Sequence, residues 1–82
     1  MLNLGPQTLK KLQTLGVSTI EDIENLGVLE TYFRLKTVYG QQISLNALWA
    51  LQGAVLGIPW NQLLPELKLE LKRQLEEKNG RL

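Results

Sequence analysis

The sequence predicts an all-α protein, a single domain over residues 1–82 in which a compact bundle of five helices surrounds a buried central helix. Two observations lead to this prediction. The run from Leu45 to Leu56 is apolar on nearly every side, whereas an ordinary surface helix carries one apolar stripe. The segments around it space their apolar residues as helices do, and none alternates like a β-strand. Because the run is shorter than the ~20 apolar residues of a membrane span, we interpret it as a core helix.

The composition excludes several kinds of chemistry. The 82 residues include no cysteine and no histidine, which removes disulfides, thiol nucleophiles, imidazole acid–base chemistry and zinc sites of the Cys/His kind. Nine basic and eight acidic side chains give a net charge of +1, so any contact with DNA has to come from a local patch. The N-terminus lacks the basic and apolar regions of a signal peptide, and we expect a cytoplasmic protein.

A Leu-Gly pair recurs every 11 residues, at Gly5, Gly16 and Gly27. Glycine takes a positive φ at a helix end without steric cost. The pattern therefore indicates either three short helices that each end in glycine or a more specific helical hairpin. The first helix is expected from Pro6 to Leu15, with proline at the first helical position, where its missing N–H costs nothing.

The next two helices have clearer signals. The letters S-T-I-E from residue 18 have the form of a capping box. In this motif the side chains of Ser18 and Glu21 each accept a hydrogen bond from the backbone N–H of the other residue. This second helix is expected to end at Gly27. The third helix is expected from Val28 or Leu29 to Tyr39, because its apolar residues recur at helical spacing.

The central helix is bounded at both ends, by Ser44 as N-cap and Gly57 as terminator. Pro59 then prevents continuation of the helix. We interpret Trp60 as a plug of the core, the alternative being a stacking platform for a base or another ligand. The last helix is expected from Pro65 to about Lys78. Its predicted apolar stripe consists of Leu64, Leu67, Leu71 and Leu75.

The motifs L-N-L-G-P-Q-T from residue 2, L-G-V-S-T-I-E-D-I from residue 15 and S-L-N-A-L-W-A-L-Q-G-A-V-L-G-I-P-W-N-Q-L from residue 44 support a family assignment. Over roughly Leu2 to Leu75 the chain resembles the C-terminal domain of the TfoX/Sxy competence regulators. The resemblance implies a compact all-helical fold of the helix-hairpin-helix or SAM-like type and a part in regulating natural transformation genes. In that family the domain follows an N-terminal α/β domain, so both an excised domain and a stand-alone homologue remain open.

These observations favour a non-enzymatic regulatory module within a transcription or competence-regulation system. We expect a protein partner or self-association, with Leu29, Phe33 and Leu69 as candidates for an exposed apolar patch. The alternative is weak, sequence-independent DNA binding through the N-terminal turn, whose backbone N–H groups would hold phosphate. The residues proposed for nucleic-acid contact are Gly5, Gln7, Thr8, Lys10 and Lys11. We expect no catalytic residues, cofactor, metal, small-molecule substrate or membrane contact.

Overall fold

The computed structural model describes residues 3–80, with side chains for residues 3–77. Within this range the chain forms helices and turns and no strand, so the all-α prediction is confirmed. The α-helices are α1 (Pro6–Thr14), α2 (Ile20–Leu26), α3 (Val28–Tyr39), α4 (Leu45–Leu56) and α5 (Pro65–Gly80). Two short 3₁₀ turns, η1 (Gly40–Gln42) and η2 (Trp60–Gln62), lie on either side of α4.

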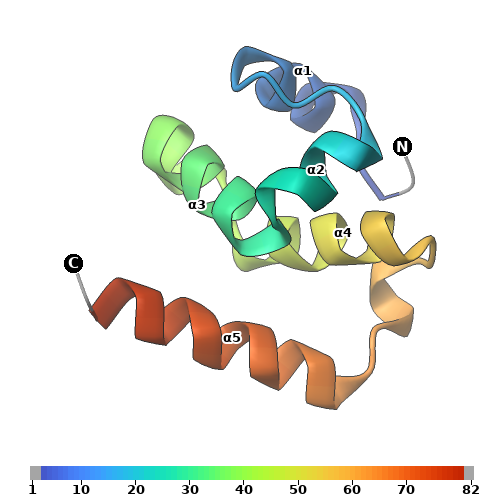
Figure 1. Cartoon of the computed structure of the whole chain (residues 1–82), viewed down its shortest axis with the longest axis vertical. Helices are drawn as coiled ribbons and strands as arrows, with labels where there is room; N and C mark the ends of the chain where they lie inside the picture. Colours follow the sequence, from blue (N-terminus) through green and yellow to red (C-terminus); the bar gives the residue numbers. More distant parts are fainter. Residues whose placement is uncertain (1–2, 81–82) are drawn as a thin grey trace.

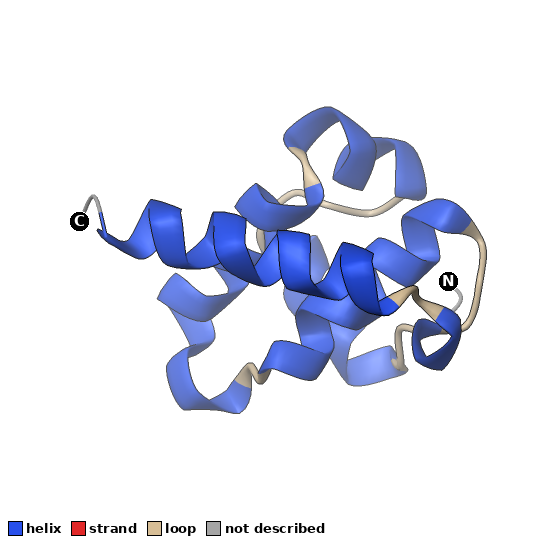
Figure 2. Ribbon diagram, turned by 90° about the horizontal axis from the view of Figure 1, so that it is seen from below, coloured by secondary structure: helices blue, strands red, loops and turns tan. Residues whose placement is uncertain are grey.

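The central helix α4 is the core of the fold, as predicted. Figure 1 shows it between α1 and α2 on one side and α5 on the other. Both α2 and α3 pack against α4 and against each other. Leu48 and Leu51 are fully buried, and Trp49 is only 8% exposed. Seen from the α5 side, α5 runs across the whole bundle (Figure 2). No helix in the described part of the chain is long and apolar enough to cross a membrane.

The glycine pattern is explained only in part by helix ends. Gly16 and Gly27 follow α1 and α2 with φ of 80° and 97°, as the repeat predicts. Gly5 does not end a helix. It precedes α1 as its N-cap, with φ of −75°, and Pro6 is the first helical residue. The interpretation of three helices that each end in glycine is therefore wrong at Gly5.

The capping box of α2 lies one residue further along the chain than predicted. Thr19, not Ser18, is the N-cap: its hydroxyl accepts a hydrogen bond from the backbone N–H of Asp22 at 3.1 Å. The Asp22 carboxylate accepts in return from the backbone N–H groups of Ser18 and Thr19, at 2.9 and 3.0 Å. At α4 the N-cap is Ser44, as predicted, but its hydroxyl makes no capping hydrogen bond.

The C-terminal segment departs most from the expectation. Leu67, Leu71 and Leu75 pack on the core, but Leu64 precedes the first helical residue and is 66% exposed. Trp60 is 43% exposed, so the core-plug interpretation is wrong. Of the three candidates for an exposed apolar patch, Leu69 is 68% exposed, Leu29 packs against the core, and Phe33 is half-buried.

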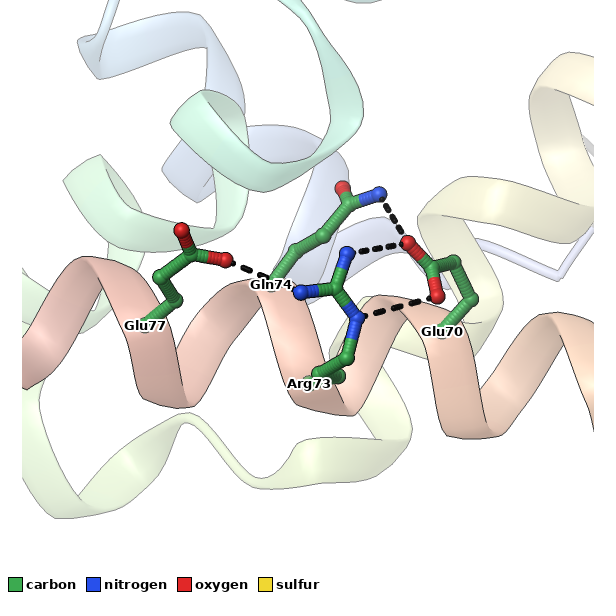
Figure 3. A network of polar contacts seen from close by, with 4 residues as sticks. All are labelled: Glu70, Arg73, Gln74 and Glu77. Atoms are coloured by element: carbon green, nitrogen blue, oxygen red, sulfur yellow. Dashed lines mark hydrogen bonds and ion pairs between the residues drawn. The ribbon is translucent and has the colours of Figure 1, made fainter.

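The outer face of α5 carries a network of charged side chains (Figure 3). Arg73 lies between Glu70 and Glu77, with N···O distances of 2.6 and 3.0 Å. The Arg73 hydrogen bond, followed by one from Gln74, lowers the pKa of Glu70 to about 2. Because the charged side chains Glu70, Arg73 and Glu77 are exposed, their ion pairs contribute little to the stability of the fold.

Candidate interaction surfaces

The five residues predicted to contact nucleic acid lie at the start of α1 and along it, and they do not all line the same hollow. Gln7 and Lys10 are exposed, and they line a surface hollow of about 380 Å³ together with Lys11. Thr8 faces a second hollow, which Lys11 also lines. Gly5 lies at the start of α1 and lines neither of these two hollows. The structure therefore places Lys11 at the junction of two surfaces that flank α1.

Lys11 is held in place by α3. Its ammonium nitrogen lies 5.3 Å from the centre of the Tyr39 ring, within the range of a cation–π contact. The Tyr39 hydroxyl is hydrogen-bonded to the Thr14 hydroxyl at 2.8 Å, which ties the end of α1 to the end of α3. The lysine is thus positioned at the surface without being neutralised by a carboxylate in the described part of the chain.

The second hollow, which we call the α1–α4 groove, has a volume of about 330 Å³. It lies between the N-terminal segment with α1, the η1–α4 junction, and η2. Its lining residues are Asn3, Thr8, Lys11, Gln42, Ile43, Ser44, Asn46, Ala47, Ala50 and Trp60. Lysine is the only ionisable residue in this set. Of the lining residues, the sequence indicated Thr8 and Lys11 as contacts and Trp60, as the alternative to a core plug, as a stacking platform. The others are brought together by tertiary packing.

Asn3 fixes one end of the α1–α4 groove. Its side-chain amide donates to the carbonyl oxygen of Ile58 at 2.8 Å, and its Oδ1 accepts from the backbone N–H of Trp60 at 3.1 Å. Opposite this contact lies Gly53 of α4, where an added Cβ would be 2.5 Å from the Asn3 amide nitrogen and 2.8 Å from the Ile58 oxygen. The absence of a side chain at Gly53 is therefore what lets the N-terminal segment and η2 meet on α4.

The turn between α1 and α2 is closed to anions. The backbone N–H groups of Ser18 and Thr19 already donate to the Asp22 carboxylate. These hydrogen bonds, with the one from the Thr19 hydroxyl, lower the pKa of Asp22. A phosphate at this turn would have to displace a carboxylate that the protein itself supplies. At the start of α1, Pro6 has no N–H to offer.

Large apolar side chains are exposed along a short stretch of chain from the end of α4 to the start of α5. Leu56 is 51% exposed, Trp60 43% and Leu64 66%. We call these three residues the apolar segment. Next to it, the Lys68 ammonium lies 5.7 Å from the centre of the Trp60 ring and 5.8 Å from that of Trp49.

The ionisable side chains do not suggest proton transfer. Both carboxylates with shifted pKa values, Asp22 and Glu70, are shifted downward by hydrogen bonds, which makes them weaker bases. The pKa of Tyr32 is raised by burial in the core. Among the described residues no group of three or more acidic side chains is placed to hold a metal ion.

Comparison with known proteins gives one family and one solved structure. The sequence model of the TfoX C-terminal domain matches residues 1–75. The crystal structure of an uncharacterized protein from Listeria monocytogenes, in a triclinic form, has a TM-score of 0.83 to this chain at 29% sequence identity. That match covers 98% of this chain and 90% of the other. No curated protein matches the sequence.

Proposed function

Because this chain belongs to the TfoX C-terminal domain family, we propose that it is a non-enzymatic regulatory module that binds another protein within a transcription or competence-regulation system. The observation that carries the proposal is the exposure of the apolar segment. Leu56, Trp60 and Leu64 fall within one short stretch of chain and are each more than two-fifths exposed. Large apolar side chains left exposed close together along the chain support a surface that contacts another protein.

The shifted pKa values of the described carboxylates support a binding role over a catalytic one. An active site needs a group whose pKa is poised near the working pH. The described carboxylates with shifted pKa values move away from neutrality, and the Asp22 carboxylate serves to cap a helix. The ionisable groups therefore have structural roles that account for their shifts.

Site-specific photo-crosslinking tests the proposal. A photoreactive residue at position 56 or 64, introduced into the protein in its native host, is expected to give the same protein adduct. The same residue in place of Glu76, which is exposed further along α5, is the control and should not give it. The Leu56→Glu substitution should abolish the adduct formed from position 64. Equal crosslinking from all three positions, or none, would contradict the proposal. Sedimentation velocity shows whether the partner is a second copy of the chain.

DNA binding through α1 is a second candidate function. One observation favours it: Gln7, Lys10 and Lys11 line the same hollow, and no acidic residue lines it. Two observations oppose it. Pro6 removes a backbone donor at the start of α1, and Asp22 occupies the donors of the α1–α2 turn.

The two candidates separate in a titration. If α1 binds a duplex, affinity should fall steeply between low and moderate salt, because each phosphate contact releases a counterion. The double substitution Lys10→Glu with Lys11→Glu should abolish it. The apolar-segment variant Leu64→Ser is the matched control and should bind the duplex like the parent protein. The absence of duplex binding at low salt excludes this candidate and leaves the protein-binding proposal untouched.

A further inference from the structure

Trp60 is a large apolar side chain held at the surface. Its backbone N–H donates to Asn3 Oδ1. Its Cα packs closely on α4, at 3.3 Å from where a Cβ added at Gly53 would lie. Lys68 of α5 lies over its ring at 5.7 Å. Contacts from three separate parts of the chain therefore fix the position of a ring that remains 43% exposed.

The same ring forms one end of the α1–α4 groove. Polar side chains line the groove around it, and four of them, from the described residues, make no hydrogen bond within the protein. These four are Thr8, Gln42, Ser44 and Asn46. Hydroxyl and amide groups of this kind both donate and accept hydrogen bonds. They match the edge of a nucleobase, which also carries donors and acceptors in one plane.

The charge of the groove favours an anionic ligand. Lys11 is its one ionisable lining residue, and no aspartate or glutamate lines it. Ala47 and Ala50 of α4 also line it, and their short side chains leave room for a flat ring. An exposed indole, uncommitted polar groups and a lysine are the three components that proteins use to bind unpaired nucleotides: stacking, edge contacts and phosphate contact.

We propose that the α1–α4 groove binds an unpaired nucleotide, with the base stacked on Trp60 and the phosphate toward Lys11. The nucleotide is either a free mononucleotide or part of a single strand, which share this chemistry. A base within a duplex does not fit the proposal, because its faces are already stacked. The groove shares Trp60 with the apolar segment, but Leu56 and Leu64 do not line it. Variants at residues 56 and 64 therefore test protein binding without changing the groove, and variants at Lys11 and Ala47 test the groove without changing the apolar segment.

Fluorescence titration provides the direct test. In the Trp49→Phe variant, Trp60 is the only tryptophan, so a stacked base should quench its emission. The probes are the common ribonucleoside monophosphates, short mixed-sequence single-stranded DNA and RNA, and the matching duplex DNA. Quenching by the monophosphates assigns a free nucleotide, and quenching by the single strands alone assigns a strand. Both outcomes support the proposal.

Variants then locate the site, with binding measured by anisotropy of a labelled probe. Trp60→Leu should weaken binding about tenfold to a hundredfold, as expected for loss of one stacked base. Lys11→Gln should weaken it and reduce the salt dependence by about one phosphate contact. Lys72→Gln, an exposed lysine of α5 outside the groove, is the matched control and should leave single-strand binding by the groove intact.

Ala47→Leu keeps the test decisive if Trp60→Leu fails to fold, because it fills the groove while leaving the indole in place. The proposal is overturned if no probe binds at low salt. It is also overturned if the duplex binds more tightly than its separated strands, or if neither Trp60→Leu nor Ala47→Leu reduces affinity.

Discussion

The helices α4 and α5 are both rich in leucine, but they use it differently. Between Leu45 and Leu56, α4 has no charged residue and is covered by other helices, so that Leu48 and Leu51 are fully buried. In α5 a single stripe reaches the core, while Leu69 on the opposite side is 68% exposed. A leucine therefore stabilises the fold only where other parts of the protein cover its side chain. Apolar content alone does not decide burial.

Leucine-to-alanine substitutions in the two regions give the largest expected contrast. Leu51→Ala in α4 should lower the free energy of unfolding by about 2–5 kcal/mol, since it removes buried methyl groups and leaves a cavity. Leu64→Ala and Leu69→Ala remove the same atoms from the surface and should change it by less than about 0.5 kcal/mol. Urea denaturation followed by circular dichroism measures all three. Similar losses at residues 51 and 69 would show that α5 is covered in solution.

Much of this contrast could be predicted from the sequence. The bounds of α4 were predicted to the residue, because Ser44, Gly57 and Pro59 mark its ends by local rules. The range of α3 was predicted from the helical spacing of its apolar residues. The capping box was misplaced by one residue because the neighbouring Ser18 and Thr19 are both good N-caps. In the structure Asp22, three residues after Thr19, closes the box.

Gly53→Ala tests the close approach of the N-terminal segment and η2 to α4. The new Cβ would lie 2.8 Å from the Ile58 carbonyl oxygen, a backbone atom that moves only with η2. Strain of this kind costs about 1–3 kcal/mol, and it should exceed the gain of up to about 1 kcal/mol that alanine brings to a helix. At Gly5 an added Cβ meets nothing within 4 Å, so Gly5→Ala loses only the preference for glycine over alanine at an N-cap and should cost less than about 1 kcal/mol. Stabilisation by Gly53→Ala would contradict the contact.

The candidate sites could be predicted less well, because they depend on contacts between distant parts of the chain, such as the one at Gly53. Trp60 was expected in the core because it is large and apolar. Its exposure depends on Asn3, 57 residues away, which fixes the backbone of η2. In the α1–α4 groove, Gln42 and Asn46 likewise lie near Lys11 because of tertiary packing. No local sequence pattern predicts that they come together. By contrast, Lys10 and Lys11 were found as a pair because adjacent residues of one helix stay close in any packing.

Lys68 joins the two helices, and its loss should have an intermediate effect. The ammonium lies within 5.8 Å of two indole rings, Trp49 of α4 and Trp60 of η2. Lys68→Met keeps most of the aliphatic chain but removes the charge, and should cost about 1 kcal/mol. Lys72→Met, also on α5 but exposed and without an ion pair among the described residues, is the matched control. Equal effects of the two substitutions in urea denaturation would show that the indoles do not hold Lys68.

Glu70→Gln should have the smallest effect on the stability of the fold. The dependence of that effect on pH distinguishes it from the effects of the other substitutions. The Arg73 and Gln74 hydrogen bonds lower the pKa of Glu70 from 4.5 to about 2 in the folded protein. A lowered pKa in the folded state means that the ionised carboxylate stabilises the fold above the unfolded-state pKa. The advantage of the parent protein over Glu70→Gln should therefore be constant above about pH 5, and it should disappear as the pH falls from 4.5 towards 2.

Thermal unfolding at a series of pH values measures this difference as a change in Tm. The control is Glu76→Gln, since the described ion pairs of α5 join Arg73 to Glu70 and Glu77 and do not include Glu76. A Tm difference for Glu70→Gln that does not change with pH would mean that Arg73 fails to hold the carboxylate in solution. The charged side chains on the outer face of α5 would then add nothing to the stability of the fold. The contrast with α4, whose buried side chains stabilise the fold by packing, would be larger.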